Sequence, residues 1–79
     1  MSNLVKYFSE NRYQFTYHLG DRVRGIWNGI PFTGTVQLDT LLDEYDGPFV
    51  IVHSDLPVKH DDTIYTMLRV SHENISYLK

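Results

Sequence analysis

The spacing of hydrophobic and polar residues changes early in the chain. Leu4, Val5 and Phe8 are spaced as on one face of a helix, so residues 3–10 are predicted to form a short helix. A helix of this length is unstable alone, and we expect it to cover an open end of the remaining structure or a neighbouring subunit. From residue 13 to residue 19 hydrophobic and polar residues alternate, which predicts a half-buried strand.

The alternation resumes on both sides of Asn28-Gly29, which is the strongest hairpin signal in the chain. Pro31 follows closely and favours a loop longer than two residues. Gly34 interrupts the returning strand, where it predicts a bend or a bulge. Residues 22–38 are therefore expected to form an antiparallel hairpin.

The second half of the chain contains two segments that are predicted to be loops. Residues 39–48 are acidic, and residues 54–62 are polar and contain Pro57. Between them, the continuous apolar run of residues 49–52 predicts a strand that is buried on both faces. Residues 63–70 are strand-like, residues 71–74 form a single turn, and residues 75–78 close the chain. The expected core residues are Val23, Val36, Phe49, Ile51 and Val70.

Length and composition favour one small globular domain over residues 1–79, with a helical segment at 1–12. A domain of this size buries only ~60% of the surface of its unfolded chain, so its core is small. The chain has no cysteine, which fits a reducing, cytoplasmic location. No apolar run reaches the ~20 residues that span a bilayer, and no membrane association is expected.

Strands this short, separated by turn signals, are typical of a small antiparallel barrel. Residues 20–25 (Gly-Asp-Arg-Val-Arg-Gly) and 32–36 (Phe-Thr-Gly-Thr-Val) resemble the opening hairpin of SH3-like barrels of the KOW and Tudor type. Residues 70–75 are similar to their closing element, a 3₁₀ turn before a short last strand. The resemblance covers residues 17–78 and implies a mainly β fold of five or six strands in an SH3-like barrel, preceded by a short helix.

Candidate chemistry does not favour an enzyme. No serine lies in a Gly-x-Ser-x-Gly turn, and the chain has no glycine-rich phosphate loop. The opening Gly-Asp-Arg-Val-Arg also resembles that of type II dihydrofolate reductases, but the pore-forming glutamine of their later strand is absent at residues 62–65. His53, His60 and the neighbouring aspartates match no established metal spacing, so we expect neither a metal nor a cofactor.

Charge is distributed unevenly along the chain. Residues 1–38 carry four basic and two acidic residues, whereas residues 39–79 carry three basic and eight acidic ones. The net charge of −3 disfavours a general nucleic-acid binder without excluding a local basic patch. The predicted binding face combines cationic and aromatic side chains with a hairpin turn, which is a composition enriched in binding hot spots. Its residues are Arg22, Arg24, Trp27, Asn28 and Phe32.

The sequence therefore predicts a non-catalytic binding module. We expect it to be encoded by a phage and to bind a protein of the host, or to bind a second copy of itself. The alternative is a barrel that binds nucleic acid or a small anion, with Lys6 and Arg12 added to the same face or with a site between subunits. A competing surface is the acidic one, in which carboxylates mimic a run of phosphates. Its residues are Asp43, Glu44, Asp46, Asp61 and Asp62.

Overall fold

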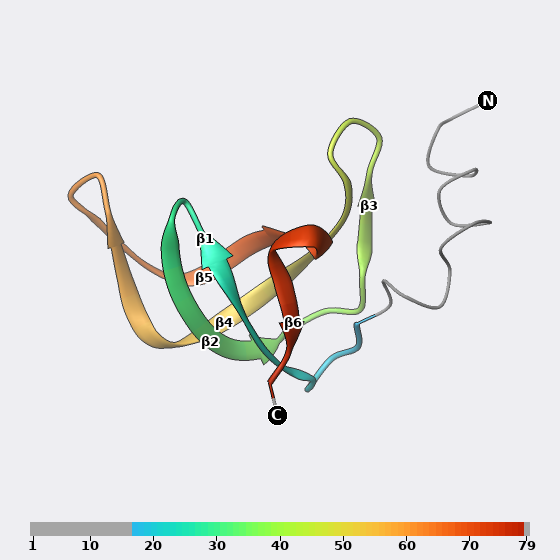
Figure 1. The fold of residues 1–79 in the computed structure, drawn as a ribbon, viewed down its shortest axis with the longest axis horizontal. Coiled ribbons are helices and arrows are strands. Elements are labelled where there is room, and N and C mark those ends of the chain that lie inside the picture. The colour runs from blue at the N-terminus through green and yellow to red at the C-terminus, as the bar shows by residue number, and fades with distance from the viewer. Residues whose placement is uncertain (1–16, 79) are drawn as a thin grey trace.

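The computed structural model describes residues 17–78, which form a six-stranded antiparallel sheet that curls into a half-barrel (Figure 1). The elements are β1 (Arg22–Trp27), β2 (Ile30–Val36), β3 (Leu41–Asp43), β4 (Gly47–His60), β5 (Thr63–Ser71), the 3₁₀ turn η1 (His72–Asn74) and β6 (Ile75–Tyr77). The strand order is β3-β4-β2-β1-β6, and β5 pairs with β4. The prediction of a mainly β, antiparallel fold is confirmed. The helix predicted at residues 3–10 lies outside the described residues.

The β1–β2 hairpin turns in two residues, so the prediction of a longer loop is wrong. Trp27 pairs with Ile30, and Asn28 and Gly29 both have positive φ, at 49° and 79°. These angles belong to a turn whose twist matches that of the flanking strands. Pro31 is accommodated within β2, opposite Ile26.

Much of the sequence predicted to be loop is strand. β3 lies inside the acidic segment, and β4 runs without a break from Gly47 through the polar stretch to His60. Pro57 fits because it lies between His53 and Val58, where the register of β4 against β5 shifts. A proline is tolerated at such an irregularity, since no regular ladder hydrogen bond is required of it. The alternation predicted for residues 13–19 is not continued as a strand at its described end, where residues 19 and 20 form a turn.

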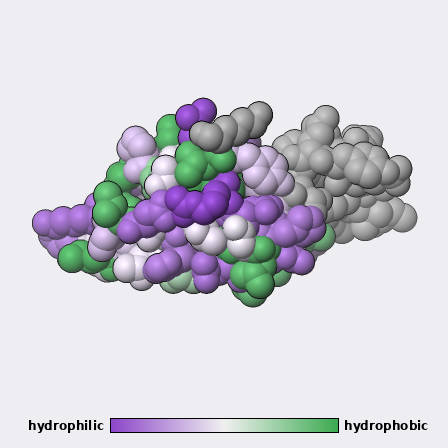
Figure 2. All heavy atoms as spheres, turned by 90° about the horizontal axis from the view of Figure 1, so that it is seen from below, coloured by the Kyte–Doolittle hydropathy of each residue, from purple (hydrophilic) through white to green (hydrophobic). Residues whose placement is uncertain are grey.

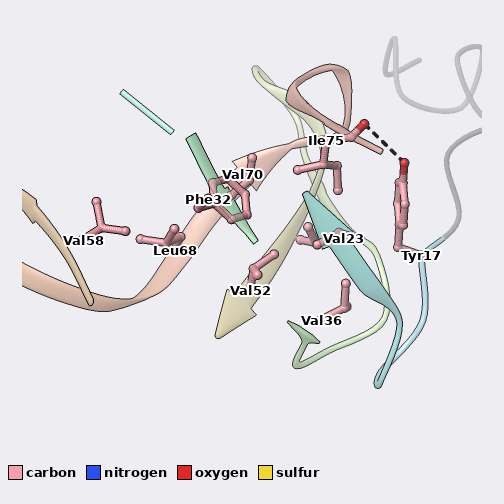
Figure 3. Close-up of a cluster of buried hydrophobic side chains, with 10 residues drawn as sticks. Tyr17, Val23, Phe32, Val36, Val52, Val58, Leu68, Val70 and Ile75 are labelled. Carbon is pink, nitrogen blue, oxygen red and sulfur yellow. Dashed lines mark hydrogen bonds between the residues drawn. The ribbon is translucent and has the colours of Figure 1, made fainter. Parts of the chain in front are cut away.

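The core lies on one face of the curled sheet (Figure 3). Val23, Val36 and Val70 are buried as predicted. Ile51 and Phe49 are only half-buried, because the inward positions of β4 are those of Val50 and Val52. A strand in a one-sided antiparallel sheet alternates between faces, so the expectation that residues 49–52 are buried on both sides is wrong. On the outer face, the guanidinium of Arg69 lies 4.0 Å from the centre of the Phe49 ring.

Gly34 marks a close crossing of β2 and β4 rather than a bulge. The register of β2 against β1 is continuous through Gly34, which also pairs with Ser54 of β4. A Cβ atom at this position would collide with the carbonyl oxygen of His53 and the side chain of Val52. The absence of a side chain therefore lets the two strands approach one another closely.

Tyr17 ties the chain before β1 to the end of the half-barrel. Its hydroxyl donates to the carbonyl oxygen of Ile75 over 3.4 Å, and its backbone N–H donates to Thr40 Oγ1 over 2.8 Å (Figure 3). Thr40 Oγ1 also lies 3.0 Å from His72 Nε2, and the Tyr17 ring packs edge-on against His72. Burial of the imidazole lowers the pKa of His72 to about 4.

The burial pattern of β4 and β5 predicts different costs for two similar truncations. Leu68→Ala removes a fully buried side chain and should lower the free energy of unfolding by roughly 2–5 kcal/mol. Ile51→Ala should cost clearly less, because its side chain is half-exposed. Urea denaturation of both variants checks this, and an equal loss in the two would contradict the observed alternation.

His72 predicts a specific dependence of stability on pH. In the unfolded chain an imidazole has its ordinary pKa of 6.5, whereas the pKa of His72 in the fold is about 4. The unfolded state therefore takes up a proton first, and stability should fall as the pH drops from 6.5 towards 4. In His72→Gln this slope should flatten. His53→Gln, which removes an exposed histidine, should keep the slope of the unmodified chain. Unfolding measured across this pH range decides the matter, and parallel slopes for all three proteins would exclude His72 as the source.

Candidate functional site

A groove of about 940 Å³ runs along the β1–β2 hairpin. It is lined by residues 24–26 and 30–33 of the hairpin, residues 56–59 of β4 and residues 73–76 of η1 and β6, with Ser54 at its margin. Pockets that hold ligands typically measure roughly 300–1,000 Å³, so this groove has room for a peptide segment or a sizeable small molecule. We call it the hairpin groove.

The groove exists because β4 separates from β2. The two strands pair only over residues 34–36 and 52–54, and β4 then passes through its irregular stretch before it pairs again with β5 at Val58. Residues 30–33 of β2 have β1 on one side and lie outside this pairing with β4 on the other. The space between the diverging strands is part of the groove.

Asp55 is clamped at the point where the strands diverge. Its two carboxylate oxygens accept hydrogen bonds from Arg22 Nη1 and Nη2 over 2.7 and 2.6 Å, and Oδ2 also accepts one from Thr33 Oγ1 over 2.7 Å. Arg22 Nη1 donates further to Thr35 Oγ1 over 2.9 Å. The hydrogen bonds from Arg22, followed by that from Thr33, hold the pKa of Asp55 well below its ordinary value. Arg22 is thus engaged in a two-pronged ion pair within the fold.

The hairpin groove is largely apolar and carries an excess of positive charge. Ile26 and Leu56 line it although 53% and 76% of their surfaces are exposed. Arg24 and Lys59 also line it, and within residues 17–78 neither forms an ion pair. Glu73 is the acidic residue of the lining. A ligand that is apolar and acidic would complement this surface.

The structure divides the binding face predicted from the sequence. Arg24 and Phe32 both line the hairpin groove, whereas Arg22 is paired with Asp55. Trp27 lies on the opposite face of β1 from Arg22 and Arg24. Successive side chains of a strand point to opposite faces, and Trp27 is an odd number of positions away from both arginines. Asn28 forms the turn.

Trp27 joins the tips of two hairpins. Its ring centre lies 4.9 Å from that of Tyr65 and 5.4 Å from that of His60, both in edge-on arrangements. It is partly buried against the core. This packing connects the β1–β2 hairpin to the outer end of the β4–β5 hairpin, and it is a structural role for a side chain that the sequence placed at a binding face.

The acidic residues of the competing surface lie on two separate turns. Asp43 ends β3, and Glu44 and Asp46 lie in the turn that follows it. Asp61 and Asp62 form the turn between β4 and β5, which lies at the opposite side of the sheet (Figure 1). No three metal-ligating side chains come together in the part of the chain that the structure describes. The face seen from below carries a band of hydrophilic residues, with hydrophobic side chains gathered in patches around it (Figure 2).

Sequence reasoning missed the contribution of β4 to the groove. Leu56 and Pro57 were assigned to a polar loop, yet they form a wall of the groove. Two signals were present: an isolated leucine within a polar stretch, and a proline at which regular strand pairing must be interrupted. Neither signal identifies a groove unless the strand that faces them is known.

No helix among the described residues is long and apolar enough to cross a bilayer.

Comparisons with known proteins do not assign the chain to a family. No family model, curated protein or solved structure matches the chain. The chain is a small antiparallel β protein with a strongly curled, half-barrel sheet.

Proposed function

We propose that the protein is a non-catalytic binding module whose hairpin groove takes an apolar, acidic segment of a protein partner. The observation that carries this proposal is the combination, in one groove, of exposed apolar side chains and two cations that form no ion pair with another described residue. Leu56 and Ile26 offer apolar surface that is released from water when a partner covers it. Arg24 and Lys59 supply the charge that selects an acidic partner.

We further propose that the half-barrel belongs to the SH3-like type. Three features support this view: the hairpin that opens the sheet, the 3₁₀ turn that follows β5, and the pairing of the last strand with β1. In such a small fold, function depends on the particular groove rather than on the strand arrangement. The similarity to SH3-like barrels therefore supports a compact binding module. The kind of partner it binds depends on the chemistry of the hairpin groove.

Nucleic-acid binding is the weaker candidate. It needs several cations on one face to neutralise successive phosphates. Of the two arginines predicted for that face, Arg22 is held by Asp55, which leaves Arg24 with Lys59 in the groove. The net charge of −3 adds a general repulsion of polyanions.

Selection of peptides from a random library tests the proposal directly. Peptides enriched on the unmodified protein should combine aromatic or aliphatic residues with Asp or Glu. Leu56→Glu should weaken their binding about tenfold or more, because it places a charge within the apolar surface and repels their carboxylates. Fluorescence anisotropy with a labelled peptide measures this, and the affinity should decrease as salt is raised.

Leu19→Glu is the matched control, since Leu19 is 67% exposed and lies outside the groove. It introduces the same charge at a similarly exposed aliphatic position and should leave the affinity unchanged. Equal affinities for the two variants would rule out the hairpin groove as the site. Tight, strongly salt-dependent binding of a single-stranded oligonucleotide, with no peptide enriched, would favour the nucleic-acid alternative instead.

A further inference from the structure

The turn between β3 and β4 presents one aromatic side chain to solvent. Tyr45 is 92% exposed, and it lies between Glu44 and Asp46. Leu42, at the base of the turn, is also exposed. An aromatic ring flanked by carboxylates is the kind of apolar, acidic segment that the hairpin groove is proposed to take.

This turn is rigidly held. Asp43 Oδ1 accepts hydrogen bonds from the backbone N–H groups of Tyr45 and Asp46 over 2.8 and 3.0 Å. Asp43 Oδ2 accepts one from Arg69 Nη2 over 2.8 Å, and the same nitrogen lies 3.4 Å from Asp46 Oδ2. These contacts lower the pKa of Asp43 to about 2, with the Arg69 hydrogen bond as the largest cause, so the carboxylate is ionised and accepts these hydrogen bonds at neutral pH.

A rigid turn is a better ligand than a flexible loop of the same sequence. Association has to overcome the entropy of ordering the segments at the interface, and a turn that is already fixed loses little on binding. Tyrosine also offers a large contact area at low cost in side-chain entropy. The contacts of Arg69 with Asp43 and Asp46 thus fix a segment that presents the exposed ring of Tyr45.

Charge complementarity points to the occupant of the groove. The turn retains Glu44, which forms no ion pair with any of the described residues, whereas the groove has Arg24 and Lys59 without such partners. The turn contributes no residue to the groove of its own chain and lies on the other side of η1 from the β1–β2 hairpin (Figure 1). A second molecule is needed to bring the two surfaces together.

We propose that two copies of this chain associate head to tail, with the Tyr45 turn of one copy seated in the hairpin groove of the other. The inference rests on the proposed function, since it names the partner of the same groove. The two surfaces differ, so after one contact the first copy keeps a free groove and the second a free turn, and the association continues into open chains or closes into a ring. The contact is small, so association is weak and depends on concentration.

Sedimentation of the full chain over protein concentrations from about 1 µM to about 1 mM, which bracket weak affinities, tests the association. The average mass should rise with concentration from the 9.3 kDa of the monomer and should not level off at twice this value. Tyr45→Ser and Leu56→Glu should each remain monomeric. Leu19→Glu should associate like the unmodified chain, because Leu19 belongs to neither surface.

Mixing the two defective variants gives the decisive result. Tyr45→Ser retains an intact groove and Leu56→Glu an intact turn, so an equimolar mixture should form a one-to-one dimer and nothing larger. A second pair, Arg24→Glu with Glu44→Lys, tests the contact by charge reversal and covers the case in which Leu56→Glu fails to fold. Each variant alone should be monomeric, and their mixture should associate beyond a dimer, because both contacts between unlike copies then join opposite charges. A mixture that remains monomeric in both pairs, or a Tyr45→Ser variant that associates like the unmodified chain, would overturn the proposal.

The two proposals can fail separately. If the unmodified chain stays at 9.3 kDa at every concentration while peptides from the library still bind the groove, head-to-tail association is wrong and the binding module stands. If the library yields no peptide and Leu56→Glu changes neither mass nor binding, the groove itself is not a binding site.

Discussion

The departure of β4 from β2 is the constraint on which the rest of the structure depends. The strands cross closely at Gly34 and separate after Ser54, and the ion pair of Arg22 with Asp55 holds the point of separation. Because β4 keeps β5 as a partner beyond this point, the outer β4–β5 hairpin remains ordered although β2 no longer supports it. One change in strand pairing thereby opens the hairpin groove.

A curled sheet of this size divides its side chains sharply between two faces. The inner face holds the hydrophobic core, whereas the outer face carries ion pairs that reach across an intervening strand. Arg22 of β1 pairs with Asp55 of β4 across β2, and Arg69 of β5 pairs with Asp43 of β3 across β4. Exposed ion pairs contribute little to stability, so their main effect here is to fix geometry. The first fixes the edge of the groove and the second fixes the turn between β3 and β4.

Three of the exposed apolar side chains lie beside charged groups of one sign. Leu56 and Ile26 lie in a groove with two cations, and Tyr45 lies on a turn with carboxylates. Single exposed apolar residues are common on protein surfaces and need no explanation. A concave apolar surface with one sign of charge, together with a rigid protruding ring with the other sign, is more specific and supports a role in binding rather than in catalysis.

The sequence by itself determined the elements that depend on neighbouring residues. Hydrophobic and polar residues alternate around Val23 and around Val36, and this is a local property of the sequence. The turn propensity of Asn28-Gly29 and the single turn before the last strand are local as well. The corresponding elements form where they were expected. The length of the first turn was misjudged, since Pro31 was treated as a loop residue although a strand position opposite Ile26 accepts it.

Only the tertiary structure decided the features that depend on distant pairing. The run at residues 49–52 has no alternation of its own, so its inward positions are set by the strands beside it. Arg22 and Arg24 look equivalent in the sequence, yet they differ in role because Asp55 lies 33 residues further along the chain beside the first of them. The hairpin groove also depends on distant pairing. Its walls come from three stretches that are far apart in sequence, and the space between them opens where β4 diverges from β2.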